Sequence, residues 1–187
     1  MNVYDFDGTI YEGDSSIDFY LYTLKKYPRI LKRMPAQLVA TIGYLSGKEP
    51  KTKWKQALFS FLPDIPDIDA HIAAFCDSHY CNIYKWYLDQ QSPEDIIISA
   101  SADFLIRPMC ERLGVRYLIP SHVDKHTGHF DGENCRDKEK INRMHRELGD
   151  IHIDNFYSDS HADDPLAAIA GHAYMIKKGI PIPWPDK

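Results

Sequence analysis

The chain has 187 residues with 22 Lys and Arg, 27 Asp and Glu, a net charge of −5 and 44% hydrophobic residues. This length fits one domain of ordinary size, or a core with a modest insertion, and the apolar content excludes a disordered chain. The acidic balance argues against a nucleic-acid partner. No apolar run reaches the length of a membrane span, no basic-then-apolar leader precedes Asp5, and the four cysteines lack C-x-x-C spacing. We therefore expect a cytoplasmic protein with reduced thiols.

Short apolar runs predict buried strands that alternate with helices along most of the chain. The strands are expected over 2–6, 96–99, 115–119, 155–158 and 173–176, and the helices between the later strands over 102–113, 138–148 and 165–170. Such alternation is typical of a parallel sheet with helices on both faces. The predicted fold class is α/β, with a Rossmann-like parallel sheet core in three α/β/α layers.

The interval after the first strand has a different pattern. Residues 15–91 contain several helical periodicities separated by prolines, and no convincing strand. We interpret this interval as an inserted α-helical cap domain. The predicted core is then 1–14 together with 92–187. The proline-rich tail 180–187 is predicted to be extended.

One cap segment allows two interpretations. Residues 29–45 place Arg29, Lys32 and Arg33 before the apolar residues Leu38, Val39, Ile42 and Leu45. Such a segment can form an amphipathic helix on a membrane surface, or a cap helix that packs inward. The composition favours the inward-packing helix, so we expect no membrane attachment.

Polar residues that can carry chemistry follow three of the predicted strands. Asp5 and Asp7 end the first strand, Ser99 ends the second, and Asp159 and Asp163 follow the fourth. Because ligands bind beyond the carboxyl ends of parallel strands, we expect these side chains to share one site. Ahead of the fourth strand, the sequence NCRDKEK brings Lys138 and Lys140 near the start of a helix.

This set suits phosphoryl transfer with Mg²⁺. Carboxylate oxygens are hard ligands that hold Mg²⁺ and leave room for a substrate phosphate. One carboxylate can act as the nucleophile, and a second one two residues later can protonate the leaving oxygen and then activate water. A Ser hydroxyl, backbone N–H groups and a Lys can hold the phosphoryl oxygens. Binding of the metal and the phosphate therefore explains why the two carboxylates of Asp5 and Asp7 lie so close together in the sequence.

The same motifs resemble those of the haloacid-dehalogenase-like hydrolase superfamily, in particular its phosphoserine-phosphatase-like branch. The matching stretches are DFDGTI at Asp5 to Ile10, IISAS at Ile97 to Ser101, a Lys after the NC pair, and SDSHADDPL at Ser158 to Leu166. The resemblance implies that Asp5 is the nucleophile and Asp7 the general acid and base. It also implies metal binding by Asp5, Asp7 through its carbonyl, Asp159 and, in support, Asp163.

The resemblance assigns further roles around the phosphate. Ser99 binds the phosphate, and Gly8, Thr9, Ala100 and Ser101 lie at the substrate. Two lysines can be the phosphate-binding lysine of the family. An alignment on the NC pair places it at Lys140, whereas an alignment on Ile141 places it at Lys138. We prefer Lys140. Asp14 either contacts a cationic group of the substrate or caps the first cap helix. No cap arginine can be assigned to a substrate carboxylate, although Arg29 and Arg33 are candidates.

These features predict an Mg²⁺-dependent phosphatase that hydrolyses a small phosphate monoester, such as a phosphoserine-like metabolite, through an aspartyl-phosphate. The alternatives are a phosphotransferase, a lipid-phosphate phosphatase of the same superfamily, and a binding protein without catalysis. The pair Asp5 and Asp7 argues against the last of these, because a binding protein needs no second carboxylate.

Overall fold

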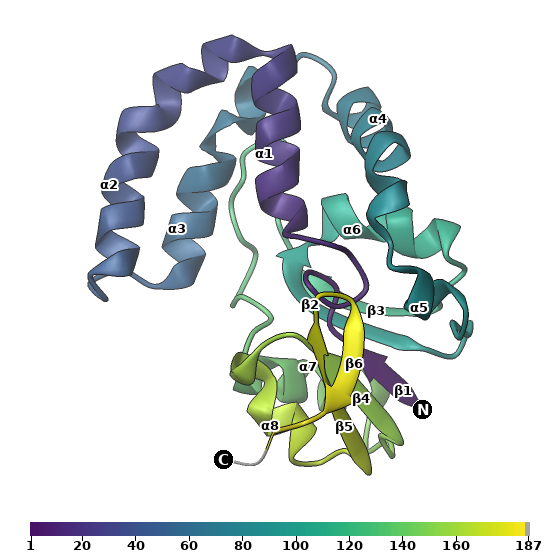
Figure 1. The fold of residues 1–187 in the computed structure, drawn as a ribbon. Coiled ribbons are helices and arrows are strands. Elements are labelled where there is room, and N and C mark those ends of the chain that lie inside the picture. Colours follow the sequence, from purple (N-terminus) through teal and green to yellow (C-terminus); the bar gives the residue numbers. More distant parts are fainter. Residues whose placement is uncertain (186–187) are drawn as a thin grey trace.

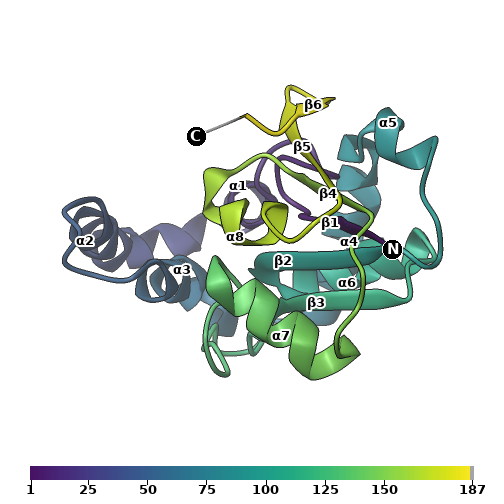
Figure 2. The ribbon, with the colours of Figure 1, turned by 90° about the horizontal axis from the view of Figure 1, so that it is seen from below.

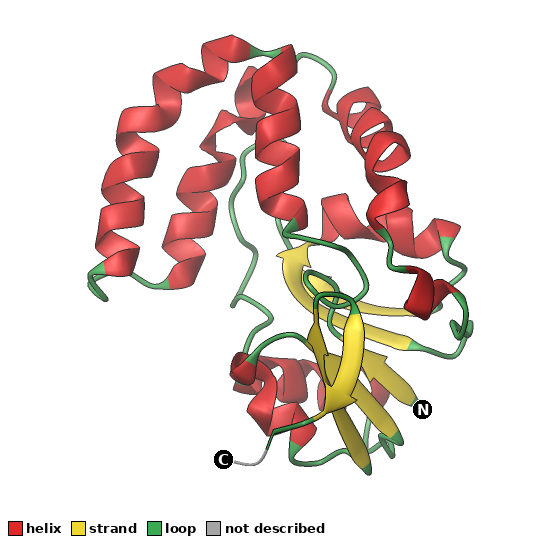
Figure 3. Cartoon of the chain, viewed as in Figure 1, coloured by secondary structure: helices red, strands yellow, loops and turns green. Residues whose placement is uncertain are grey.

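A six-stranded, mostly parallel sheet forms the centre of the protein in a computed structural model that describes residues 1–185 (Figures 1 and 3). The strand order is β3-β2-β1-β4-β5-β6. Neighbouring strands from β3 to β5 pair in parallel, and β6 pairs with β5 in the antiparallel sense. The strands are β1 (Asn2–Tyr4), β2 (Ile96–Ala102), β3 (Tyr117–Ser121), β4 (Asn155–Ser158), β5 (His172–Lys177) and β6 (Ile180–Pro183).

Both faces of the sheet are covered because successive strand residues point to opposite sides. Ile97 belongs to the hydrophobic cluster that includes Leu105 and Ile106 of α6 (Asp103–Arg112). Ile96 and Ile98 belong to the cluster on the other face, with residues of α7 (Lys138–Leu148) and α8 (Asp164–Ala167). The three α/β/α layers predicted for the core are thereby confirmed.

An α-helical cap lies between β1 and β2 in the chain and stands above the carboxyl ends of the strands (Figure 1). Its helices are α1 (Ser15–Lys26), α2 (Met34–Leu45), α3 (Lys51–Leu58), α4 (Ile68–His79) and α5 (Lys85–Leu88), with 3₁₀ turns over Pro28–Arg33, Phe59–Asp64 and Tyr80–Asn82. A fourth 3₁₀ turn, His161–Asp163, precedes α8. The limits of 15–91 given to the cap domain from the sequence stay a prediction.

The proline-rich tail forms an edge strand, which the sequence alone did not indicate. β6 turns back from β5 through Lys178 and Gly179, which both have positive φ, the combination that a two-residue hairpin turn requires. Pro181 and Pro183 are tolerated because an edge strand leaves one side of its backbone unpaired. Residues 186–187 of the predicted tail lie outside the described residues.

α2 does not pack its apolar residues inward as its composition had suggested. Gln37 is its one buried residue, while Val39 is 71% exposed and Leu45 is 77% exposed. On the side that faces α3, Tyr44 stacks on Trp54, and Trp54 donates a hydrogen bond to the Thr41 hydroxyl. No helix among residues 1–185 is both long enough and apolar enough to cross a bilayer.

A buried histidine in the cap is held neutral by its burial. The Thr23 hydroxyl donates to the Phe19 carbonyl at 2.7 Å, so it accepts at 2.9 Å from His71 Nε2. Among the described residues, His71 Nδ1 is buried with no partner that could accept a second proton. Burial lowers the pKa of His71 to about 4, and the charge of Lys26 adds to this effect.

We expect this histidine to make the fold less stable in acid. An unfolded His binds a proton below its ordinary pKa of 6.5, whereas His71 in the folded state does so only near 4. This contribution to the free energy of unfolding should be fully present above pH 6.5 and should be lost as the pH falls from about 6.5 to about 4, by up to about 3 kcal/mol. His71→Phe should remove this component. Urea unfolding of both proteins at about pH 7 and about pH 4.5 tests it, and equal losses in the two proteins would refute it.

Candidate active site

All predicted site residues except Thr9 and Lys138 meet in one cavity at the carboxyl ends of β1, β2 and β4. Strand order reverses here, because β2 and β3 lie on one side of β1 while β4 and β5 lie on the other. The cavity has a volume of about 210 Å³. The core residues that line it include Asp5, Asp7, Gly8, Ser99, Ala100, Ser101, Lys140, Asp159 and Asp163.

The loop after β1 brings Asp5 next to the fourth motif. The Asp5 N–H donates to the Tyr157 carbonyl of β4 at 2.9 Å, which holds the end of β1 against β4. Gly8 follows with φ of +69°, and a Cβ at this position would overlap Asp159 Oδ2. Only glycine therefore allows the Asp159 carboxylate to reach the β1 loop.

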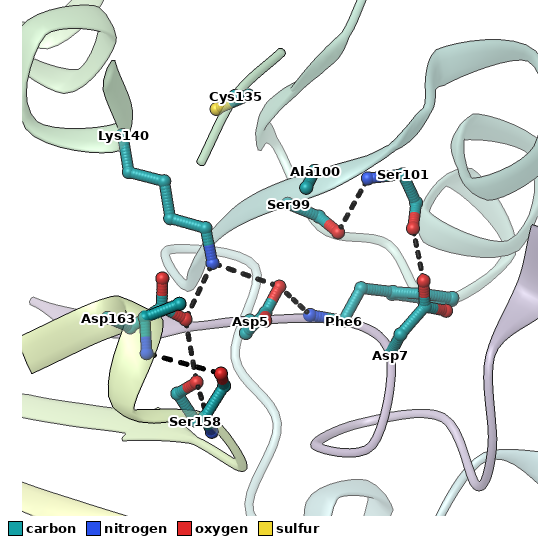
Figure 4. A network of polar contacts seen from close by, with 12 residues as sticks. Asp5, Phe6, Asp7, Ser99, Ala100, Ser101, Cys135, Lys140, Ser158 and Asp163 are labelled. Carbon is teal, nitrogen blue, oxygen red and sulfur yellow. Dashed lines mark hydrogen bonds and ion pairs between the residues drawn. The ribbon is translucent and has the colours of Figure 1, made fainter. Parts of the chain in front are cut away.

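Asp7 is fixed by hydrogen bonds from both the cap and the core, of which Figure 4 shows the one from Ser101. Its Oδ1 accepts from the Ser15 N–H at 2.9 Å, and its Oδ2 accepts from the Ser101 hydroxyl. Burial raises the pKa of Asp7 to about 6, and the charge of Asp14 adds to the rise. The Ser101 bond and the charge of Lys55 oppose it. A carboxyl with a pKa near neutrality is suited to giving and taking protons.

Lys140 lies between two carboxylates. Its Nζ is 3.1 Å from Asp5 Oδ1 and 2.8 Å from Asp163 Oδ2, and the residue is 1% exposed (Figure 4). Burial by itself would lower the pKa of Lys140, but Asp5 and Asp163 reverse this effect and raise the pKa. The ammonium is therefore charged at neutral pH. Lys138, the alternative, is exposed and does not line the cavity.

The carboxylates fit a divalent cation of the Mg²⁺ type. Burial raises the pKa of Asp5 to about 7, with Lys140 opposing the rise and Asp163 and Asp159 adding to it. Burial also raises the pKa of Asp159. A cation beside these oxygens would relieve the cost of burying several negative charges. Within residues 1–185 no three acidic, His or Cys side chains form a complete metal cage, and Mg²⁺ sites need only one or two carboxylates.

Asp163 is oriented toward the lysine. Besides Lys140, it accepts a hydrogen bond of 2.6 Å from the Ser158 hydroxyl at the end of β4. These two bonds occupy Asp163 Oδ2, so the side chain fixes Lys140 in position. Its predicted role as a supporting metal ligand stays a prediction.

The end of β2 supplies hydroxyl and backbone groups. Ser99 is buried, and its hydroxyl accepts from the Ser101 N–H at 3.1 Å. Ala100 also lines the cavity, and its carbonyl accepts from Lys55 Nζ. The pairing of β2 with β3 is irregular between Ile98 and Ala102. The residues from Ser99 to Ser101 therefore leave the regular strand pairing and line the cavity.

Two further predicted substrate residues differ in their placement. Asp14 caps α1 by accepting from the Ser16 and Ile17 N–H groups, and it also lines the cavity, so the structure allows both of its interpretations. Thr9 is fully buried beneath the β1 loop and does not line the cavity. Its N–H instead closes a turn with the Phe6 carbonyl.

Three basic residues of the cavity were not assigned from the sequence. Lys51 and Lys55 of α3 and Arg136 before α7 line the side of the cavity that faces the cap. Lys55 is 3% exposed and donates to the Ala100 carbonyl at 2.9 Å, which connects the cap to the β2 end. The spacing of Lys51 and Lys55 by four residues places them on one helix face. This spacing is the one feature of the sequence that could have indicated a shared role for the two lysines. Arg33, one of the two candidates, pairs with Asp64 instead.

Comparison with known proteins identifies the family. The family model of haloacid dehalogenase-like hydrolases matches residues 3–168 of this chain. The chain belongs to the haloacid dehalogenase-like hydrolase family. The match covers β1 through α8 and so includes every motif of the cavity.

A curated protein and solved structures of the same fold resemble the chain over nearly its whole length. Protein CicA of Caulobacter vibrioides is 26% identical over 198 residues, which cover 95% of this chain and 86% of CicA. A Bordetella pertussis Tohama I protein of unknown function has a TM-score of 0.75 at 17% identity, covering 94% of this chain and 88% of its own. A phosphoserine phosphatase solved as a phospho-aspartyl intermediate analogue has a TM-score of 0.60 at 16% identity, covering 92% and 84%.

Proposed function

We propose that this haloacid dehalogenase-like hydrolase is an Mg²⁺-dependent phosphatase that cleaves a small phosphate monoester through an aspartyl-phosphate on Asp5. The observation that carries the proposal is the position of Lys140, whose Nζ contacts Asp5 at 3.1 Å inside a cavity that also contains Asp7. A nucleophile, an acid and a fixed cation are the groups that phosphoryl transfer requires.

In the first step, Asp5 attacks the phosphorus atom. The bond between an Asp5 carboxylate oxygen and phosphorus forms as the bond to the leaving oxygen breaks, and protonated Asp7 gives its proton to that oxygen. The pKa of Asp7 near 6 leaves a useful protonated fraction close to neutral pH. The Ser15 and Ser101 bonds hold Asp7 in one orientation for this transfer.

In the second step, water releases the phosphate. Asp7, now a carboxylate, takes a proton from the water that attacks phosphorus, and the bond between phosphorus and Asp5 breaks. Inorganic phosphate leaves, Asp5 is regenerated and Asp7 is again protonated. Lys140 and the Ser99 hydroxyl lie where they can hold the phosphoryl oxygens in both steps.

Mg²⁺, when bound by Asp5, Asp159 and the Asp7 carbonyl, would supply positive charge that offsets the repulsion between the phosphate dianion and the Asp5 carboxylate. Asp163 would act by holding Lys140, as its two hydrogen bonds indicate.

The cap side of the cavity suggests a substrate with a second anionic or strongly polar group. Lys51, Lys55 and Arg136 line the cavity together with the carboxylates, and Asp14 adds one negative charge near Lys51 and Lys55. A phosphoserine-like metabolite carries groups of both signs and fits this arrangement. Closure of the cap over such a substrate would exclude bulk water from the site.

Removal of the metal should abolish activity. Purified protein with Mg²⁺ should release phosphate from an aryl phosphate, and chelation should lower the rate by roughly 10³-fold or more, because the metal provides several kcal/mol of charge stabilisation. Addition of Mg²⁺ should restore the rate. Alcohol acceptors in the same assay separate hydrolysis from transfer, since a hydrolase yields free phosphate alone. Equal rates with and without chelator would overturn the metal dependence.

A further inference from the structure

The outer side of α2 presents large apolar side chains to solvent. Leu38, Val39, Ile42 and Leu45 are 52%, 71%, 65% and 77% exposed, and no element of residues 1–185 covers them. Figure 2 shows α2 at the outer edge of the molecule, far from the sheet. The twelve residues of this helix, MPAQLVATIGYL, include no charged residue. Contiguous exposed apolar surface of this kind marks an interaction site.

The segment around α2 has a charge opposite to that of the remaining chain. We define the cap arm as Pro28–Asp64, which comprises α2, α3 and the 3₁₀ turns on either side. The cap arm contains seven Lys and Arg and only two acidic residues, a net charge of +5, whereas the remaining chain has a net charge of −10. Lys32 and Arg33 share Asp64, and Lys53 pairs with Glu49. Arg29 and Lys48 are exposed on either side of α2.

A groove on the cap arm combines apolar and basic groups. It has a volume of about 900 Å³. Ala36, Val39, Ala40 and Gly43 of α2 form its apolar part, and Lys48, Lys53 and Glu49, which pairs with Lys53, also line it. An apolar surface next to ammonium groups matches a molecule that has both a hydrocarbon chain and an anionic head.

We propose that the cap arm docks on an anionic phospholipid bilayer, with the outer side of α2 in the interface and the basic residues at the headgroups. Apolar burial and attraction to anionic lipid act together in such docking. A second copy of this chain fits less well, because two cap arms of net charge +5 would face one another. Lys51 and Lys55 of the same arm line the active-site cavity, so docking would hold that cavity near the bilayer.

Vesicle binding tests this proposal without requiring catalysis. The whole protein is sedimented with vesicles of phosphatidylcholine alone and with vesicles that contain about one third phosphatidylglycerol, at low and high salt. Binding to the anionic vesicles should be at least tenfold stronger and should weaken at high salt, since exposed Lys and Arg side chains are attracted to an anionic surface and salt screens this attraction. Equal binding to both vesicles, or binding to neither, would overturn the proposal.

The double variant Val39→Asp with Ile42→Asp tests the helix itself. It should lose at least tenfold in binding to anionic vesicles, because it places two charges in the interface. The matched control is Ile169→Asp with Ile180→Asp, which adds the same charge at exposed apolar residues of the core and should bind like the wild type. Loss of binding in both double variants would show a general charge effect and count against α2.

Two further measurements distinguish bilayer docking from misfolding of the variant and from dimer formation. Thermal unfolding checks that the α2 double variant is folded, and its activity on a soluble aryl phosphate should equal that of the wild type, since neither residue lines the active-site cavity. Light scattering without vesicles reports the oligomeric state. A dimer that the α2 variant converts to a monomer would show that a second copy covers this face, and would overturn the membrane proposal. The vesicle result stands whether or not the proposed function holds.

Discussion

Asp5→Asn should lower kcat/KM for phosphate monoesters by roughly 10⁴-fold or more, because it removes the proposed nucleophile. The amide has nearly the same shape as the carboxylate and can still accept the Phe6 N–H bond of 2.8 Å. The carboxylate of Asp5 is buried beside Asp163 and Asp159. Its loss removes the cost of burying a charge and the repulsion from Asp163 and Asp159, which together outweigh the attraction of Lys140, so the variant should unfold at the same temperature as the wild type or a higher one.

Steady-state kinetics on an aryl phosphate and thermal unfolding together test this expectation. Asp150→Asn is the control, because the Asp150 side chain is 98% exposed and the same carboxylate-to-amide change there should leave the rate unaltered. A folded Asp5→Asn variant that retains more than about a tenth of the activity would remove Asp5 from the nucleophile role.

Lys140→Met should lower kcat by roughly 10² to 10³-fold, the usual cost of removing one group that stabilises transition-state charge. It also leaves Asp5 and Asp163 buried without their cation, which should cost about 3 to 5 kcal/mol of unfolding free energy in the absence of metal. Methionine keeps most of the volume of the lysine chain. The loss therefore reports the ammonium rather than a cavity.

Lys138→Met provides the matched comparison two residues away. Lys138 is exposed and lies outside the cavity, so its loss should change the rate less than threefold and the stability by less than about 0.5 kcal/mol. Kinetics and urea unfolding of the two variants decide between the lysines. A larger loss of activity in Lys138→Met would reverse the assignment.

The two lysines show why the sequence left this choice open. Residues two positions apart on a helix point about 200° away from one another, so only one of them can face Asp5. The loop before α7 decides which lysine faces Asp5. In this loop Asp137 has a φ of +51°, which residues other than glycine seldom adopt. No periodicity in the sequence indicates that turn.

The core was predictable because its signals are local. The buried runs of β4 and the apolar face of α7 coincide with the predicted ranges 155–158 and 138–148. The motifs at the strand ends were predictable as a site because parallel strands bring their carboxyl ends together. β6 was missed because its two prolines obscure a strand pattern, and they are accepted only at an edge.

The cap was less predictable because the elements around each cap helix determine which of its sides is buried. The composition of residues 29–45 indicated a helix, which the structure forms over Met34–Leu45, yet it does not tell whether another element covers the apolar side. For the same reason, the sequence did not show that Lys51 and Lys55 face the cavity while Arg33 turns to Asp64. The contacts between cap and core decide these orientations.

The covalent intermediate gives the most direct test of the proposed mechanism. Asp7→Asn should still form the intermediate from an aryl phosphate, whose leaving group needs little protonation, and should hydrolyse it slowly because no carboxylate activates water. Rapid acid quenching followed by mass spectrometry should therefore find one phosphoryl group on the variant, located on the peptide that contains Asp5. If the variant turns over substrate while Asp5 carries no phosphoryl group at any time point, the aspartyl-phosphate mechanism is wrong.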